Sequence, residues 1–474
     1  MTVSPQKNSL SITILLVLSV IWTFLHCDKY FFWDNIVQLS VPANWYFENG
    51  ISKFFLPDEI TTGHPKFAGL YLSLIWKIFG KNIAVSHWAL SPFVYGLVYQ
   101  LFMFIKTYVA RNQREAIIIL AFVIIDTTFL SQLSLITFDV IHLFLLFLCL
   151  NQLLKNSIIL FSLSYAALMI ISLRGTMSGM GILLFYPFLK PGQNKILSLK
   201  SYLKFLPGII IISTYLLIFY FEKDWVIHNT SSDKWPGSAE IANPNQIAYN
   251  IAIFIWRLTD FGRIGIWIFL SVILFKTKNL NTIKTNRGFR ICILFAITQL
   301  VIFFPISIIY NSPPAHRYLL PVMIIANIAV IHWIYNYSRS KIFKLSLIGI
   351  LLISGHFMIY PVKIAQGWDS TTAHWPYYSL RNEMLDFIEQ KQINEDSISS
   401  FFPNISSSKY IELDNNPFNF KDFKYSNTEF VLYSNIFNID DDIIDELFHS
   451  GKWNKIKVLR DRRITFILFK KKAN

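Results

Sequence analysis

A few ionisable side chains stand out because they lie in or beside long apolar stretches of the sequence. They are Asp34, Asp139, Arg174 and Arg317. A carboxylate within hydrogen-bond reach of a hydroxyl group can act as a general base. An arginine can bind a phosphate group through two parallel hydrogen bonds. Together these residue types allow proton abstraction beside a phosphate-bearing ligand.

The composition shows how unusual these charged residues are. The chain has 474 residues, of which 53% are hydrophobic and only 15% are charged, whereas a soluble domain has about 25% charged residues. The formal net charge of +14 is typical of nucleic-acid-binding proteins, but basic residues retained in cytoplasmic loops of a membrane protein also account for it. We therefore expect a membrane protein that binds membrane lipids and no nucleic acid.

Eleven apolar stretches come close to the length of about 20 residues that a spanning helix needs. They are residues 10–27, 84–105, 115–133, 135–154, 157–173, 177–189, 205–221, 262–275, 290–310, 318–336 and 343–360. The sixth and eighth stretches are short, so each could be a partial span. The sequence thus predicts an all-α polytopic membrane domain of about 11 transmembrane helices over residues 1–360.

The distribution of charge predicts the orientation of these helices. With a cytoplasmic N-terminus, 17 of the 28 basic residues before position 361 face the cytoplasm, together with one of the 13 acidic residues. Basic residues favour the cytoplasmic side. High usage of Ile, Phe, Lys and Asn is typical of a low-GC bacterial genome. We expect a multi-pass protein of the bacterial inner membrane.

An odd number of crossings leaves residues 361–474 outside the cytoplasm. This tail has 15 basic and 16 acidic residues, unlike the basic loops. It alternates strand-like runs, at 430–433 and 464–469, with an amphipathic stretch near 379–391. The pattern predicts a small soluble, extracytoplasmic α/β domain.

The longest connection within the membrane domain is the first outer loop, residues 28–83, and loops of this length are usually functional. It contains Asp34 and then His64 and Lys66, followed by an amphipathic run over residues 67–79. His64 and Lys66 are further site candidates. The many aromatic residues in the loop also suit a segment that merely lies on the membrane surface.

The remaining candidates lie at predicted outer ends of spans. Asp139 opens the fourth span, Arg174 lies between the fifth and sixth, and Arg317 and Tyr318 begin the tenth. An arginine at a helix end is commonly an interfacial anchor. However, basic residues are usually depleted on the extracytoplasmic side of a membrane protein. A phosphate partner is therefore the simplest explanation for these arginines.

Two other acidic residues have simpler explanations. Asp126, inside the third span, is followed by threonines that could satisfy its carboxylate, which makes it a weaker candidate. Asp260 could neutralise either Arg257 or Arg263, which flank it.

In order and topology, residues 1–360 resemble GT-C-type membrane glycosyltransferases, and most closely glycosyltransferase family 39. That family includes protein O-mannosyltransferases and the aminoarabinose transferases that act on lipid A. The matching elements are Trp33-Asp34-Asn35, His64-Pro65-Lys66-Phe67, Ile78-Phe79-Gly80, Asp139 and the run from Arg317 to Pro321. The chain departs from the pattern at Asn35, where many relatives have a second acidic residue, and at Lys66, where many have proline.

The resemblance implies an inverting glycosyltransferase that uses a polyprenyl-phosphate-linked sugar donor and a glycan, lipid or protein acceptor. Its early acidic residue, Asp34 here, would be catalytic. We assign Arg174 and Arg317 to the phosphate, and His64, Lys66, Asp139 and Tyr318 to substrate binding. We find no P-loop, nucleotide-sugar glycine motif or metal-ligand spacing, so we expect no cofactor, with a divalent metal left open.

Two alternatives remain open at this point. The chain could be a transporter or flippase for a lipid-linked saccharide, a function that repeated halves and polar residues deep in several spans would favour. It could also be a catalytically inactive GT-C relative that acts as an assembly subunit, as the departure at Asn35 suggests.

Overall fold

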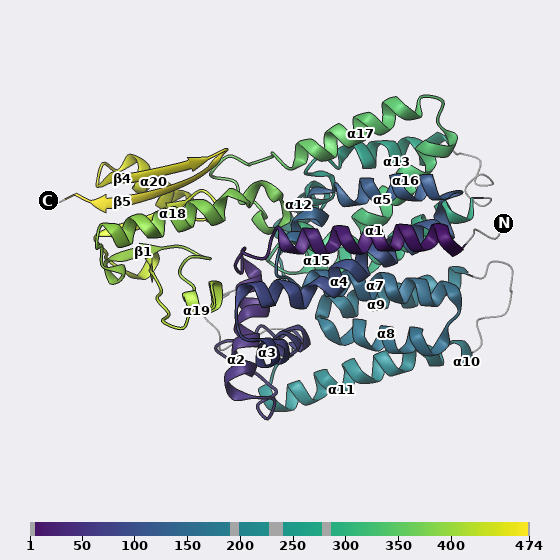
Figure 1. The fold of residues 1–474 in the computed structure, drawn as a ribbon, viewed down its shortest axis with the longest axis horizontal. Helices are drawn as coiled ribbons and strands as arrows, with labels where there is room; N and C mark the ends of the chain where they lie inside the picture. Colours follow the sequence, from purple (N-terminus) through teal and green to yellow (C-terminus); the bar gives the residue numbers. More distant parts are fainter. Residues whose placement is uncertain (1–4, 190–198, 227–239, 277–285, 473–474) are drawn as a thin grey trace.

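The computed structural model describes residues 5–189, 199–226, 240–276 and 286–472. Figure 1 shows a bundle of helices from whose left-hand end the C-terminal sheet projects, with the start of α1 at the opposite end. The main helices of the bundle are α1 (Pro5–Phe24), α4 (Ile83–Phe104), α5 (Gln113–Ile124), α6 (Thr127–Ser134), α7 (Phe138–Lys155), α8 (Ile158–Ile171), α9 (Leu173–Phe185), α11 (Leu206–Lys223), α12 (Pro244–Thr259), α13 (Ile264–Lys276), α15 (Arg287–Ile309), α16 (Leu320–Tyr337) and α17 (Lys341–Gly355).

Several of these helices have the length and apolar character of membrane spans. Within the described ranges, five of them qualify singly, and up to seven spans result if each of two bent helix pairs crosses once. The five contain α4, α7, α11, α15 and α16. The predicted multi-pass membrane fold is confirmed, while the number of eleven crossings and the orientation stay predictions.

Two pairs of helices are bent. The first pair lies where the sequence predicted one straight span over residues 115–133, whereas in the second pair the sequence predicted only α13. Helices α5 and α6 meet at 76°, and α12 and α13 meet at 95°. At the first bend the Asp126 carboxylate accepts hydrogen bonds from the backbone N–H groups of Thr128 and Phe129. Such a cap starts a new helix, so α6 departs from the direction of α5.

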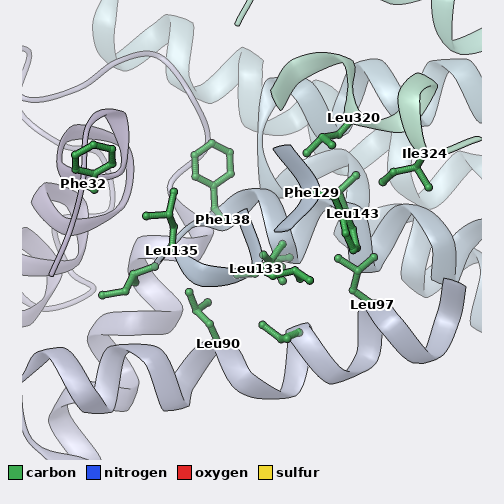
Figure 2. Close-up of a cluster of buried hydrophobic side chains, with 14 of the residues drawn as sticks. Phe32, Leu90, Leu97, Phe129, Leu133, Leu135, Phe138, Leu143, Leu320 and Ile324 are labelled. Carbon is green, nitrogen blue, oxygen red and sulfur yellow. The ribbon is translucent and has the colours of Figure 1, made fainter. Parts of the chain in front are cut away.

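A continuous apolar core joins the helices next to the bends. Figure 2 shows buried hydrophobic side chains packed together, and the labelled ones include Leu97, Phe129, Leu143 and Ile324. They come from α4, α6, α7 and α16 respectively. The core therefore fixes the short helix α6 against the start of α16.

The first loop is folded and packed rather than simply spread over a surface. It contains η1 (Ile36–Ser40), α2 (Val41–Asn49) and α3 (Phe67–Phe79), the last of which the amphipathic run predicted. Phe31 and Phe32 are buried, and the backbone N–H of Phe31 donates to the carbonyl of Ile411. The loop thus packs against the C-terminal part of the chain.

The C-terminal residues form a mixed five-stranded sheet in the order β2-β1-β3-β5-β4. Strand β1 is parallel to β2 and β3, whereas β5 is antiparallel to β3 and β4. The elements are α18 (Pro376–Gln390), β1 (Ile398–Ser400), α19 (Ser408–Ile411), β2 (Lys421–Asp422), β3 (Phe430–Ser434), α20 (Asp441–His449), β4 (Trp453–Asp461) and β5 (Ile464–Lys471). The predicted α/β architecture of the tail is confirmed.

The connection between α17 and α18 contacts the helical bundle again. In this segment, residues 366–375, which we call the strap, the side chains of Trp368, Ser370 and His374 are buried. Part of the proposed soluble domain thus packs on the proposed membrane domain. The predicted division of the chain at residue 360 stays a prediction.

Candidate functional site

Asp34 lies in the first loop, in a short helical stretch that follows the turn at Trp33 and leads through Asn35 into η1. Trp33 ahead of it has a φ of 49°, a left-handed conformation that is uncommon for a bulky residue. The Asp34 side chain is 35% exposed, and its Oδ2 atom forms an ion pair with Nη2 of Arg317. The predicted base is therefore both accessible and held by a cation.

Arg317 is the residue on which the acidic groups converge. It lies in η5 (His316–Leu319), just before α16, and its side chain is only 4% exposed. Besides Asp34, it contacts Asp369 through Nη1 and lies 3.4 Å from Asp139 through Nε. The planar guanidinium has donors on several edges, so one side chain orients carboxylates from three segments.

Asp139 and Arg174 form a second buried ion pair beside the first. Asp139 lies in the first turn of α7, where the hydroxyl of Thr137 accepts a hydrogen bond from its backbone N–H. Arg174 lies in the first turn of α9, and its Nη1 contacts Oδ1 of Asp139. The two helix starts thereby bring the predicted pair together.

Tyr318 lies between the two arginines. Its ring centroid is 4.4 Å from Cζ of Arg174 and 5.3 Å from Cζ of Arg317. A cation is attracted to the face of an aromatic ring, so Tyr318 stabilises both guanidinium groups in one place.

His64 and Lys66 complete the cluster from the first loop. The Nζ atom of Lys66 is 3.2 Å from Oε1 of Gln38 and 2.5 Å from Oγ1 of Thr62, both neutral groups. Burial lowers the pKa of Lys66 to about 7. Burial and, to a lesser extent, the nearby charges of Lys66, Arg174 and Arg317 together lower the pKa of His64 to about 3. His64 is therefore a neutral group beside three cations.

The structure thus brings all of the predicted site residues into one neighbourhood. The contacts join Asp34, Arg317, Asp139 and Arg174 in a continuous row, with Tyr318 stacked on its cations. Their roles in catalysis or binding stay predictions. A buried row of opposite charges that includes an accessible carboxylate can both remove a proton and bind an anion.

Sequence reasoning missed Asp369, whose carboxylate contacts Arg317 from the strap. The residue precedes Ser370, Thr371 and Thr372 in a polar run after the last predicted span. This run has neither helical nor strand periodicity. That absence indicated only that the run forms neither a membrane span nor a strand. It did not indicate that the segment would pack on the bundle.

Two acidic residues outside the row have structural partners. Asp126 pairs with Arg263, with its Oδ2 2.6 Å from Nε and its Oδ1 2.8 Å from Nη2. The Asp260 carboxylate lies 2.8 Å from Nε2 of His316. Across the described ranges, no three His, Cys, Asp or Glu side chains are grouped so as to hold a metal ion.

The helical bundle with its mixed C-terminal sheet is similar in fold, over nearly the whole chain, to solved structures of ArnT. Two crystal structures of ArnT from Cupriavidus metallidurans match, one bound to undecaprenyl phosphate and the other in the apo state. The first has a TM-score of 0.53 at 10% identity, covering 96% of this chain and 97% of that one. The second has a TM-score of 0.51 at 10% identity, covering 98% of each.

The likeness confirms the predicted GT-C-type resemblance at the level of the fold. No protein-family model matches the sequence, and no curated protein matches it. At 10% identity, the fold alone is shared. Function must therefore be argued from the residues of this chain.

Proposed function

We propose that the chain is an inverting glycosyltransferase that moves a sugar from a polyprenyl-phosphate-linked donor to an acceptor on the extracytoplasmic face of a bacterial inner membrane. The observation that carries the proposal is the row of contacts from Asp34 through Arg317 and Asp139 to Arg174. The likeness in fold to an ArnT structure bound to undecaprenyl phosphate supports the donor class.

In the proposed reaction, Asp34 takes the proton of the acceptor hydroxyl. The oxygen of that hydroxyl attacks the anomeric carbon of the sugar at the same time. The bond from that carbon to the donor phosphate breaks, and the phosphate oxygen keeps the electron pair. Attack from the face opposite the leaving group inverts the configuration. One carboxylate is enough for this scheme, unlike hydrolysis by paired carboxylates.

The leaving phosphate needs fixed positive charge rather than a proton. Arg174, Arg317 and the protonated form of Lys66 supply it from three different segments. Preorganised charges in a site with little water stabilise developing negative charge strongly. Neutral His64 accommodates the group without adding a further cation.

A donor-consumption assay tests the proposal. Proteoliposomes containing the full chain are incubated with a radiolabelled polyprenyl-phosphate sugar and crude envelope acceptor, and new glycosidic products are separated from donor. We expect label to appear in the acceptor. Label that only changes leaflet would indicate a flippase, and label that stays on the donor on the added side would indicate a non-catalytic subunit. Either result overturns the proposed activity.

A further inference from the structure

Asp369 is a buried carboxylate that the scheme above does not use. Its Oδ2 atom pairs with Nη1 of Arg317, and its side chain is 6% exposed. Its Oδ1 accepts a hydrogen bond of 3.0 Å from the hydroxyl of Ser370. The carboxylate is thus oriented from one side and ion-paired from the other.

The backbone of the strap is fixed just as firmly. Ser131 and Gln132 of α6 donate hydrogen bonds of 2.8 and 2.7 Å to the carbonyl of Asp369. Thr128 of the same helix donates 2.9 Å to the carbonyl of Ser370. Helix α6, which Asp126 caps at its start, therefore docks the strap so that Asp369 reaches Arg317.

The charges around Arg317 limit its ability to bind an anion. Asp34, Asp139 and Asp369 contact it, while Arg174 is the other guanidinium in the row. With Asp369 added to the row, three carboxylates face two guanidinium groups, so these five side chains have no excess positive charge. An incoming phosphate must therefore compete with a carboxylate for Arg317.

We propose that Asp369 is a positioning residue that holds Arg317 against Asp34 and competes with the donor phosphate for the same guanidinium. Of the three carboxylates, Asp34 is assigned to the acceptor and Asp139 is already paired with Arg174. The proposed reaction scheme gives Asp369 no role other than its contact with Arg317. The identity of the anion as a donor phosphate rests on the proposed function.

Asp369→Asn separates the two effects of this residue. Asparagine keeps the size of the side chain and an oxygen that accepts from Ser370, and the backbone bonds to α6 do not depend on the side chain. Removal of the charge frees one edge of Arg317 for an anion while loosening its hold on Asp34. We expect undecaprenyl phosphate to bind the purified full chain about three- to tenfold more tightly than it binds the unchanged protein.

Matched variants show whether the effect passes through Arg317. Asp445→Asn makes the same charge change at an exposed ion pair with Lys363, and we expect unchanged binding there. In an Arg317→Gln background, Asp369→Asn should no longer tighten binding. Equal or weaker binding by Asp369→Asn, or tightening that persists without Arg317, would overturn the proposal.

Kinetic constants give a readout that a purely structural role would not move. We expect Asp369→Asn to lower both kcat and the KM for donor, because the anion binds better while the base is held less well. A structural defect would lower the amount of active protein with KM unchanged, which would contradict the proposal.

Inorganic phosphate separates this inference from the proposed function. If the unchanged protein binds no polyprenyl phosphate, the donor assignment fails, but competition for Arg317 is still measurable with millimolar phosphate. We expect phosphate to raise the Tm of Asp369→Asn more than that of the unchanged chain and of Asp445→Asn. An equal increase in all three proteins would overturn the inference.

Discussion

Asp34 and Arg317 form an ion pair although 283 positions separate them in the chain. The first comes from the loop after α1 and the second from the turn before α16. The proposed base is therefore held by a residue that is also proposed to bind the leaving group. Changes to either one should alter both proton transfer and donor binding.

Asp34→Asn keeps the size of the side chain and removes the base. We expect the rate of transfer to fall by about 10²- to 10⁴-fold, the usual contribution of a positioned acid or base. The amount of protein in the membrane should be unchanged, because the side chain is partly exposed. Product formation per mole of purified protein measures the effect, and full activity would refute the assignment.

Arg317→Lys keeps the charge and removes the planar group that reaches several partners at once. We expect kcat to fall about 10²-fold, as when one donor to a developing anion is lost. Arg339→Lys, an exposed arginine just beyond the other end of α16, is the matched control and should leave kcat unchanged. Unaltered donor use by Arg317→Lys would make Arg317 an anchor rather than a phosphate-binding group.

Lys66 makes the binding of polyprenyl phosphate sensitive to pH. Burial lowers the pKa of its amine to about 7, so in the unliganded protein the positive charge is present below pH 7 and is lost above it. We expect affinity to decrease as the pH is raised from about 7 to 9, a range in which phosphate, with a second pKa near 6, is already about 90% ionised or more and changes its charge little.

Two substitutions test that this dependence arises from Lys66. Lys66→Arg keeps a charge throughout the range, so its affinity should no longer decrease. Lys66→Gln should bind weakly at every pH. A decrease in affinity that survives in both variants would assign the titration to another group.

Asp126→Asn should affect stability rather than chemistry. It leaves the Arg263 guanidinium, which is 2% exposed, as a buried charge with a neutral partner. Breaking such a pair lowers the free energy of unfolding by about 3 kcal/mol or more. We expect a lower Tm in detergent with kcat per folded molecule unchanged, and Asp445→Asn should shift stability by less than about 0.5 kcal/mol. A lower kcat at full stability would instead place Asp126 in the reaction.

The sequence predicted the fold well where the length of an apolar run decides the structure. Each predicted span overlaps a helix, and strands β3 and β5 coincide with the predicted strand-like runs at 430–433 and 464–469. The bends were not predictable, since hydropathy runs unbroken through Asp126 while its side chain caps a new helix. Helix α12 was missed because its polar positions interrupt the apolar run.

The site was predictable to the extent that isolated charges in apolar surroundings need a partner. That argument identified Asp139, Arg174 and Arg317, while Asp34 was identified from its long loop and from the family resemblance. The structure joins the four by direct contacts. Sequence reasoning did not reach Asp369, because an aspartate in a polar segment needs no such explanation. The docking of that segment depends on α6, and so on a bend that no periodicity reveals.

The attachment of the strap to α6 has a consequence for how this protein can diverge. Because Asp369 completes the surroundings of Arg317 from beyond the last helix of the bundle, a graft that replaces everything after α17 would keep this contact only if the new tail carried a carboxylate at the same place. Recombination in nature would meet the same obstacle. The two parts of the gene should therefore be inherited together.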